Sequence, residues 1–143
     1  MRANIFSSRD RRRLERAAAL YLLACYRSRT AARATEFAST ILWTQPYLSR
    51  FVAAVTGLSV RNYLRRRQLA YAAYLLRATP MSNREVALAS AFGTVATFYR
   101  CFLDAYGKTP GAYRREVMKC DTVKEIVEIE MILARPTRRS HEM

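Results

Sequence analysis

The stretches TQPYLSRFVAAVTG (44–57) and TVATFYRCFLDAYG (94–107) carry the same pattern, 50 residues apart. Each copy opens with a threonine, continues with apolar residues at helical spacing, carries one arginine on the opposite side (Arg50 or Arg100) and ends at a glycine. Threonine is a good helix N-cap, and glycine commonly follows the last turn of a helix. The repeat therefore predicts two short helices with equivalent roles.

Each of these helices has the form of a DNA-reading element. A short helix with one outward arginine is typical of a recognition helix in the major groove. An arginine donates two hydrogen bonds to a guanine, so we predict that Arg50 and Arg100 read bases. Because the pattern occurs twice, the leading hypothesis is a protein that reads double-stranded DNA with two helices in tandem.

The charge of the chain agrees with a polyanionic partner. The 143 residues include 25 Lys and Arg against 11 Asp and Glu, which gives a formal net charge of +14. Acidic and basic residues balance from Lys119 onward, so the excess positive charge lies in residues 1–118. Such a charge favours nucleic acid or an anionic membrane surface. Binding to a membrane surface usually requires one helix with a large amphipathic face. The several capped helices with core-like apolar stripes therefore disfavour a membrane-surface role.

The residue inventory argues against catalysis. Cys25, Cys101, Cys120 and His141 lack metal-ligand spacing, and only six acidic residues precede Lys119. We therefore expect no enzyme activity, no cofactor and no metal site. The cysteines are interpreted as small apolar side chains, with redox sensing at Cys101 as the alternative. No apolar run approaches 18 residues and no signal-peptide pattern opens the chain, which predicts a cytoplasmic protein.

Helical periodicity and capping residues extend over most of the chain. We expect a first helix from Ser8 or Asp10, a short helix capped by Thr30, and a long helix at 59–78 between the two repeats. The box SNRE (82–85) opens another helix, because its serine and glutamate can cap each other's backbone. The first turn of the first helix is rich in arginine, which predicts either a solvated basic end or an arm along phosphates.

These elements define the expected organisation. The predicted fold is all-α, with about seven helices: two helix-turn-helix units, at about 30–57 and 82–107, joined by the long connecting helix at about 59–78. Around this frame we expect a basic N-terminal arm, the tandem domain and a C-terminal extension, over residues 1–11, 12–118 and 119–143.

Four segments resemble the DNA-binding domain of AraC/XylS-type transcription regulators. They are PYLSRFVAAVTGLSVRNYLRRRQLAYAAYLLRAT (46–79), NREVALASAF (83–92), TFYRCF (97–102) and YGKTPGAYRRE (106–116). The resemblance covers roughly residues 12–117, and it is most similar to the short, sensor-less MarA/SoxS-like form. It implies a bacterial cytoplasmic regulator, an activator, which binds promoter DNA as a monomer and recruits RNA polymerase.

The resemblance also implies which side chains meet DNA. The base-contacting positions that match the family pattern are Gln45, Pro46, Tyr47, Ser49 and Arg50 on the first reading helix, and Val95, Ala96, Tyr99 and Arg100 on the second. The implied phosphate contacts are Thr44, Arg61, Arg66 and Thr94. Leu48, Phe51, Val52, Phe98 and Phe102 are expected in the core.

Three positions depart from the family pattern. The turns of the two units carry Leu42 and Ala91 where glycine is common, and Gln68 replaces the arginine usual in the connecting helix. A leucine at positive φ is strained, so we expect the first turn to take a different shape. These departures keep an alternative open: a degenerate member that binds other regulators or RNA polymerase without reading DNA.

Two further features have competing interpretations. Trp43 is expected in the core, with base stacking as the alternative. In the tail, DTVKEIVEIEMILARP (121–136) combines a capping box with strand-like alternation, and a helix is the favoured prediction. The tail either packs back on the domain or offers a dimer contact or an acidic surface for RNA polymerase. If its removal changes neither stability nor activation, none of these roles applies.

Overall fold

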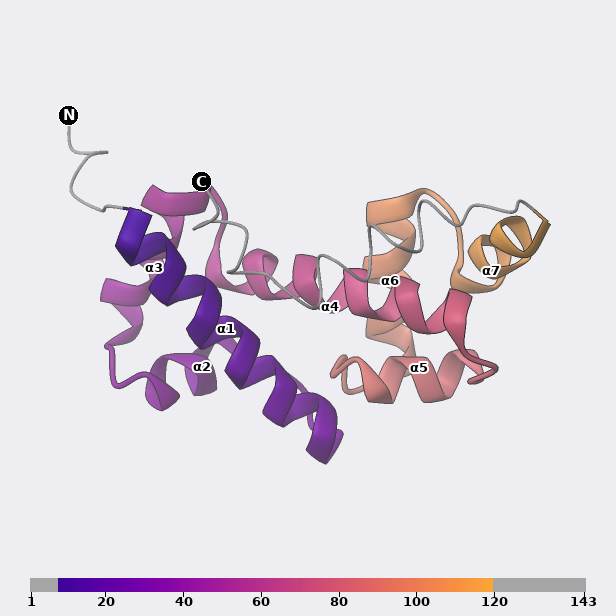
Figure 1. Cartoon of the computed structure of the whole chain (residues 1–143), viewed down its shortest axis with the longest axis horizontal. Coiled ribbons are helices and arrows are strands. Elements are labelled where there is room, and N and C mark those ends of the chain that lie inside the picture. The colour runs from indigo at the N-terminus through magenta and orange to yellow at the C-terminus, as the bar shows by residue number, and fades with distance from the viewer. Residues whose placement is uncertain (1–7, 120–143) are drawn as a thin grey trace.

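The computed structural model describes residues 8–119, with side chains to residue 118, and this part of the chain contains helices and no strand. The helices are α1 (Ser8–Ser28), α2 (Ala34–Thr40), α3 (Gln45–Thr56), α4 (Val60–Ala78), α5 (Asn83–Ala89), α6 (Val95–Tyr106) and α7 (Pro110–Lys119). Figure 1 shows α4 running between a group formed by α1–α3, the N-terminal group, and a group formed by α5–α7, the C-terminal group. The predicted all-α fold with two helix-turn-helix units on a connecting helix is confirmed.

Local capping sets most of the helix ends, as the sequence predicted. The hydroxyls of Thr44, Ser59 and Thr94 accept hydrogen bonds from backbone N–H groups three residues later, at 3.1–3.3 Å. Ser82 and Glu85 form the complete capping box at the start of α5. After α3 and α6 the chain turns at glycines in the left-handed region, with φ of 79° and 74°, where a side chain would be strained.

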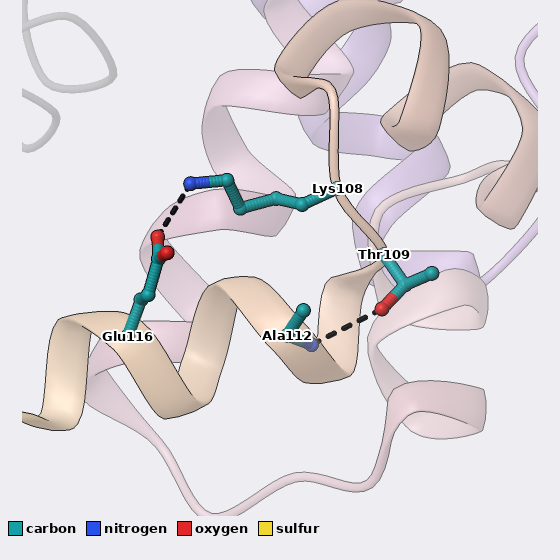
Figure 2. Close-up of polar contacts among 4 residues, drawn as sticks. All are labelled: Lys108, Thr109, Ala112 and Glu116. Carbon is teal, nitrogen blue, oxygen red and sulfur yellow. Dashed lines mark hydrogen bonds and ion pairs between the residues drawn. The ribbon is translucent and has the colours of Figure 1, made fainter.

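Hydrogen bonds and an ion pair hold α7 to the residues before it and to the end of α4. The Thr109 hydroxyl accepts a hydrogen bond from the N–H of Ala112 at 3.1 Å, at the start of α7 (Figure 2). Figure 2 also shows the ion pair between Lys108, which precedes the helix, and Glu116 on it. Arg114 then donates from α7 to the carbonyls of Leu76 and Met81, at 2.9 and 2.6 Å. These last bonds satisfy backbone oxygens at and beyond the end of α4, where helical partners run out.

The prediction that Thr30 caps the second helix was wrong. The N–H of Thr30 bonds back to the carbonyl of Cys25 at 3.1 Å, which closes α1, and α2 starts only after Arg33. The buried hydroxyl of Tyr21 takes over the capping role. It accepts the N–H of Arg33 at 2.9 Å and donates to the carboxylate of Glu36 at 2.6 Å. Burial raises the pKa of Tyr21, so this hydroxyl stays protonated at neutral pH.

Two apolar cores meet along α4. Phe37 and Phe51 lie in the first core, with side chains of α1 and the start of α4, and Phe98 and Phe102 lie in the second core, with α5 and the rest of α4. Ala91, in the turn between α5 and α6, belongs to the first core and not to the second. A residue of the C-terminal group thus completes the core of the N-terminal group.

The two helix-turn-helix turns have the same shape despite their unusual residues. Leu42 has φ of 60° and Ala91 has φ of 66°, both in the left-handed region. In each turn the N–H of the next residue bonds five residues back, from Trp43 to Ala38 and from Phe92 to Ala87, both at 3.1 Å. This is the Schellman arrangement that normally ends in glycine. The expectation that Leu42 changes the shape of the first turn was wrong, and the leucine adopts the strained conformation.

We expect Leu42→Gly to stabilise the protein by about 0.5–1 kcal/mol. A left-handed backbone costs an L-residue about 1–2 kcal/mol, and glycine removes this strain. Glycine is also more flexible in the unfolded chain, which lowers the net stabilisation by about 0.5–1 kcal/mol. The side chain of Leu42 is 90% exposed, so its removal loses little packing. The urea midpoint measures the change. Ala91→Gly is the matched control, because its methyl group is buried and its loss offsets the relief of strain. A lower midpoint for Leu42→Gly would contradict the argument.

Candidate nucleic-acid interface

The outer face of α3 is built from the residues that the sequence analysis selected. Its exposed side chains over the first two turns are Gln45, Pro46, Tyr47, Ser49 and Arg50. The residues between them turn inward, since Leu48, Phe51 and Val52 are buried against the first core. The 3.6-residue period of the helix separates the two sets. The N-terminal half of α3 therefore presents polar and aromatic groups to solvent.

Aromatic packing holds this face in place. The ring of Trp43 lies edge-on to Tyr47 and Phe51, with centroids 4.8 and 5.0 Å apart. Trp43 is half-buried, and the guanidinium of Arg13 lies 6.0 Å from its ring. The core interpretation of Trp43 thus agrees with its packing. Edge-on aromatic pairs add about 0.5–1.5 kcal/mol beyond area burial, so Tyr47 is a supported side chain with an exposed edge.

The outer face of α6 is smaller than expected. Thr94, Ala96 and Arg100 are exposed, but Val95 and Tyr99 are half-buried against the second core. These two predicted base-contacting positions are thus only partly exposed. The hydroxyl of Tyr99 accepts a hydrogen bond from the side-chain amide of Asn83 at 3.0 Å, which ties it to the first turn of α5. The sequence could not show this contact, because the two residues lie 16 positions apart.

Arginines of α4 line an open groove between this helix and the segment that leads into α2. The groove has a volume of about 360 Å³ and is lined by Arg33, Arg61, Arg65 and Gln68 together with residues 31–35 and Leu64. Arg61 and Arg65 share one side of α4 because they are four residues apart. Arg61 and Arg66 are the predicted phosphate contacts of this helix. Arg66 is exposed, and the groove brings in Arg33 and Arg65 as well.

Arg67 and Gln68, also at the middle of α4, are held by contacts within the protein. Arg67 lies over the ring of Tyr63, with its guanidinium carbon 5.6 Å from the centroid, and donates to the Tyr63 hydroxyl at 3.4 Å. Gln68 is buried, with an exposed fraction of 3%. It occupies the place of the family's arginine, and its side chain borders the groove but is almost fully covered. Any positive charge near Gln68 therefore comes from neighbouring arginines.

The reading helices carry one exposed guanidinium each, on Arg50 and Arg100. Within residues 8–118, Arg50 and Arg100 make neither an ion pair nor a hydrogen bond. Neither α3 nor α6 has an acidic residue in its first turn, so the positive end of each helix dipole is uncompensated by a carboxylate there. An anion would be stabilised at these helix ends.

The expectations from the sequence also concerned the cysteines, possible metal ligands and possible membrane-spanning helices. Cys25 is buried, which raises the pKa of its thiol, and Cys101 is half-buried on α6. The described residues contain no group of three or more His, Cys, Asp or Glu able to hold a metal ion. Within the same part of the chain no helix is both long and apolar enough to cross a membrane. Cys120, His141 and the tail from residue 120 lie outside the described residues.

Comparisons with known proteins agree with this geometry. A helix-turn-helix domain family matches residues 37–116. The TetD protein of transposon Tn10 from Escherichia coli is 37% identical over 73 residues, which cover 51% of this chain and 53% of TetD. The regulatory protein SoxS of Escherichia coli K12 is 32% identical over 71 residues, which cover 50% of this chain and 66% of SoxS. The matched segment thus spans less than two thirds of either relative.

A solved structure shares the fold over a larger part of the chain. The DNA-binding domain of the global transcriptional factor AdpA, solved in complex with a target DNA, superposes with a TM-score of 0.62 at 19% identity. The match covers 71% of this chain and 93% of that domain. The family match spans more than half of the chain, from the middle of α2 into α7. This protein therefore belongs to the AraC-type helix-turn-helix family of DNA-binding transcription regulators.

Proposed function

We propose that this protein binds promoter DNA with sequence specificity by inserting α3 and α6 into adjacent major grooves. The observation that carries the proposal is the pair of exposed arginines, Arg50 and Arg100, at equivalent positions of two capped helices on either side of α4, neither of them bonded to another residue within 8–118. Each guanidinium can bond the O6 and N7 atoms of a guanine. Two helices of one protein meet successive major grooves when they lie about one turn of DNA apart, or about 34 Å.

The phosphate backbone supplies the remaining contacts in this proposal. Thr44 and Thr94 stand at the N-termini of the reading helices, where backbone N–H groups and a hydroxyl meet a phosphate. Arg61 and Arg66 donate from α4 to phosphates between the two grooves. Each phosphate contact releases counterions, so replacing one of these arginines lowers the salt dependence of binding by about one unit of slope.

Selection of sites from random duplexes tests the proposal. The experiment uses the full chain at about 150 mM salt, because any protein of this charge binds DNA loosely at low salt. We expect an enriched motif with two patches of preferred bases, centred about one turn of DNA apart. Selection that yields no enrichment over the input would reject sequence-specific reading and leave binding to other regulators or to RNA polymerase as the function.

The two half-sites should contribute unequally to specificity. On α3, Gln45, Ser49 and Arg50 all present hydrogen-bonding groups, whereas on α6 the hydroxyl of Tyr99 is engaged and Ala96 offers only a methyl group. We expect single base changes to cost about 1–3 kcal/mol at several positions of the α3 half-site and at one position of the α6 half-site. Competition binding with singly substituted duplexes measures these penalties. Similar penalties in both half-sites would contradict this expectation.

We further propose that one chain occupies one site and activates transcription by recruiting RNA polymerase. A single chain carries both reading helices, so a second copy is not needed to complete the site. The mass of the complex on a single selected duplex tests the stoichiometry. Run-off transcription with and without the protein, on a template that carries the site upstream of a weak promoter, tests activation, and a decrease in transcript would indicate a repressor instead.

A further inference from the structure

We propose that a clamp between the two groups of helices, formed by Ala31, Ala32, Gln68, Ala91 and Gly93, restricts this protein to DNA sites with one spacing of half-sites. The clamp joins the loop between α1 and α2 to the turn between α5 and α6. It acts as a positioning element, because none of its residues belongs to the reading faces of α3 or α6. The inference rests on the proposed function, since a spacing has meaning only if both helices read DNA.

Gln68 is the centre of the clamp. Its side-chain amide nitrogen donates to the carbonyls of Ser90 and Ala91, at 3.1 and 2.9 Å, and the side chain is 3% exposed. Both amide protons are therefore used on the turn that leads into α6. Buried polar groups that lose their partners are costly, about 1–3 kcal/mol each, so these bonds fix the turn to the middle of α4.

The loop of the N-terminal group completes the attachment. The N–H of Ala32 donates to the carbonyl of Ala91 at 3.0 Å, so this carbonyl accepts from both Gln68 and Ala32. The methyl group of Ala91 is buried in the first core, whose other members belong to α1–α4. These contacts give a physical reason for alanine at a left-handed position where glycine is usual, because the methyl group packs against the other group of helices.

The close approach at the clamp requires a glycine. A Cβ atom at Gly93 would lie 3.0 Å from the Cβ of Ala31, closer than ordinary packing allows, and the φ of Gly93 is 85°. The next residue, Thr94, caps α6. The start of the second reading helix is thus placed directly by contact with the N-terminal group, in addition to its connection through α4.

A second contact lies further along α4. Tyr26 of α1 stacks on Tyr71 of α4, with centroids 4.4 Å apart. Tyr26 packs against the first core and Tyr71 against the second. The clamp and this pair together tie the N-terminal group to the second half of the molecule at more than one point. A helix linker alone bends and twists, whereas two groups joined at several points keep one relative orientation.

A fixed orientation has a consequence for DNA. Adding one base pair between two half-sites rotates one of them by about a tenth of a turn and moves it along the axis by about 3.4 Å. A rigid pair of reading helices cannot follow both changes at once. A protein with a loosened clamp can follow them in part.

Binding to duplexes of altered spacing tests the clamp. The duplexes carry the two selected half-sites at the selected spacing and with one base pair removed or added between them. We expect the wild type to bind the altered spacings about tenfold or more weakly, on the scale of a lost base contact. For Gln68→Met and Gly93→Ala the loss should shrink to about threefold or less, with the base preferences inside each half-site unchanged. Asn62→Met is the matched control, because Asn62 is an exposed amide on the same helix, and its loss should equal that of the wild type.

A distance measurement keeps the test independent of DNA. Nitroxide labels on the exposed positions Ala54 of α3 and Leu103 of α6, in a background without reactive thiols, report the spread of distances between the reading helices. The wild type should give one narrow distribution, and Gln68→Met and Gly93→Ala a broader one. Folded variants with the width and spacing preference of the wild type would overturn the clamp. A wild type that selects sites without a spacing preference would also overturn it while leaving the proposed function intact, and a wild type that selects nothing removes the function itself.

Discussion

Replacing Arg50 with alanine should remove the base preference at one position of the α3 half-site while leaving the α6 half-site unchanged. The guanidinium is exposed, unpartnered among the described residues, and one turn into α3. Loss of its two bonds to a guanine should cost about 1–3 kcal/mol of discrimination, or roughly 5- to 150-fold between the right and the wrong base. Site selection with the wild type and the variant in parallel measures the effect, and Arg100→Ala should blur the other patch.

The matched control separates reading from charge. Arg27→Ala removes the same charge from the exposed last turn of α1, far in sequence from both reading helices. It should weaken binding to all duplexes to a similar, small extent and leave the motif unchanged. If Arg50→Ala instead weakened all sequences equally, Arg50 would be a phosphate contact, and the assignment of α3 as a reading helix would need another residue.

Phe98→Ala should lower the free energy of unfolding by about 3–5 kcal/mol, the usual cost of removing a fully buried phenylalanine. The ring is completely buried, and its centroid lies 5.3 Å from that of Phe92 and 5.6 Å from that of Phe102. Small domains are stable by about 5–15 kcal/mol in total, so this single change removes a large part of the stability. Urea unfolding followed by circular dichroism measures the change.

A neighbouring residue on the same helix supplies the control. Leu103 lies on α6 with 48% of its side chain exposed, so Leu103→Ala should cost about 1 kcal/mol or less. Because α6 is held to the second core by Phe98 and Phe102, the destabilised variant should also lose the α6 half-site before the α3 half-site. A loss below about 1 kcal/mol for Phe98→Ala would show that α6 does not depend on this core.

Helix ends governed by nearby residues could be predicted from the sequence. The caps at Thr44, Ser59 and Thr94, and the capping box of Ser82 with Glu85, depend on groups three positions away, and all are present as expected. The predicted cap at Thr30 was wrong because the actual capping group is distant in the sequence. The start of α2 is satisfied by Tyr21, which lies twelve positions before Arg33 and comes near it only when α1 packs on α2.

The same distinction applies to the candidate interface. The outward positions of α3 follow from helical periodicity, since every third or fourth residue is buried against one core. On α6, the family resemblance placed Tyr99 on the reading face, and the amide of Asn83 and the edge of the second core keep it half-buried. The membership of Arg33 and Arg65 in one groove likewise depends on the approach of the α1–α2 loop to α4.

The sequence by itself determined the all-α fold, the tandem repeat, most of the helix ends and the outward arginines, because each depends on residues within a few positions along one helix. Only the tertiary structure decided the shape of the first turn, the burial of Gln68 and the contact of Ala91 with the other group of helices. The physical reason is that a buried polar side chain or a strained backbone is stabilised by partners distant in sequence. Gln68 bonds to residues more than twenty positions away, and such partners cannot be predicted from a local sequence pattern.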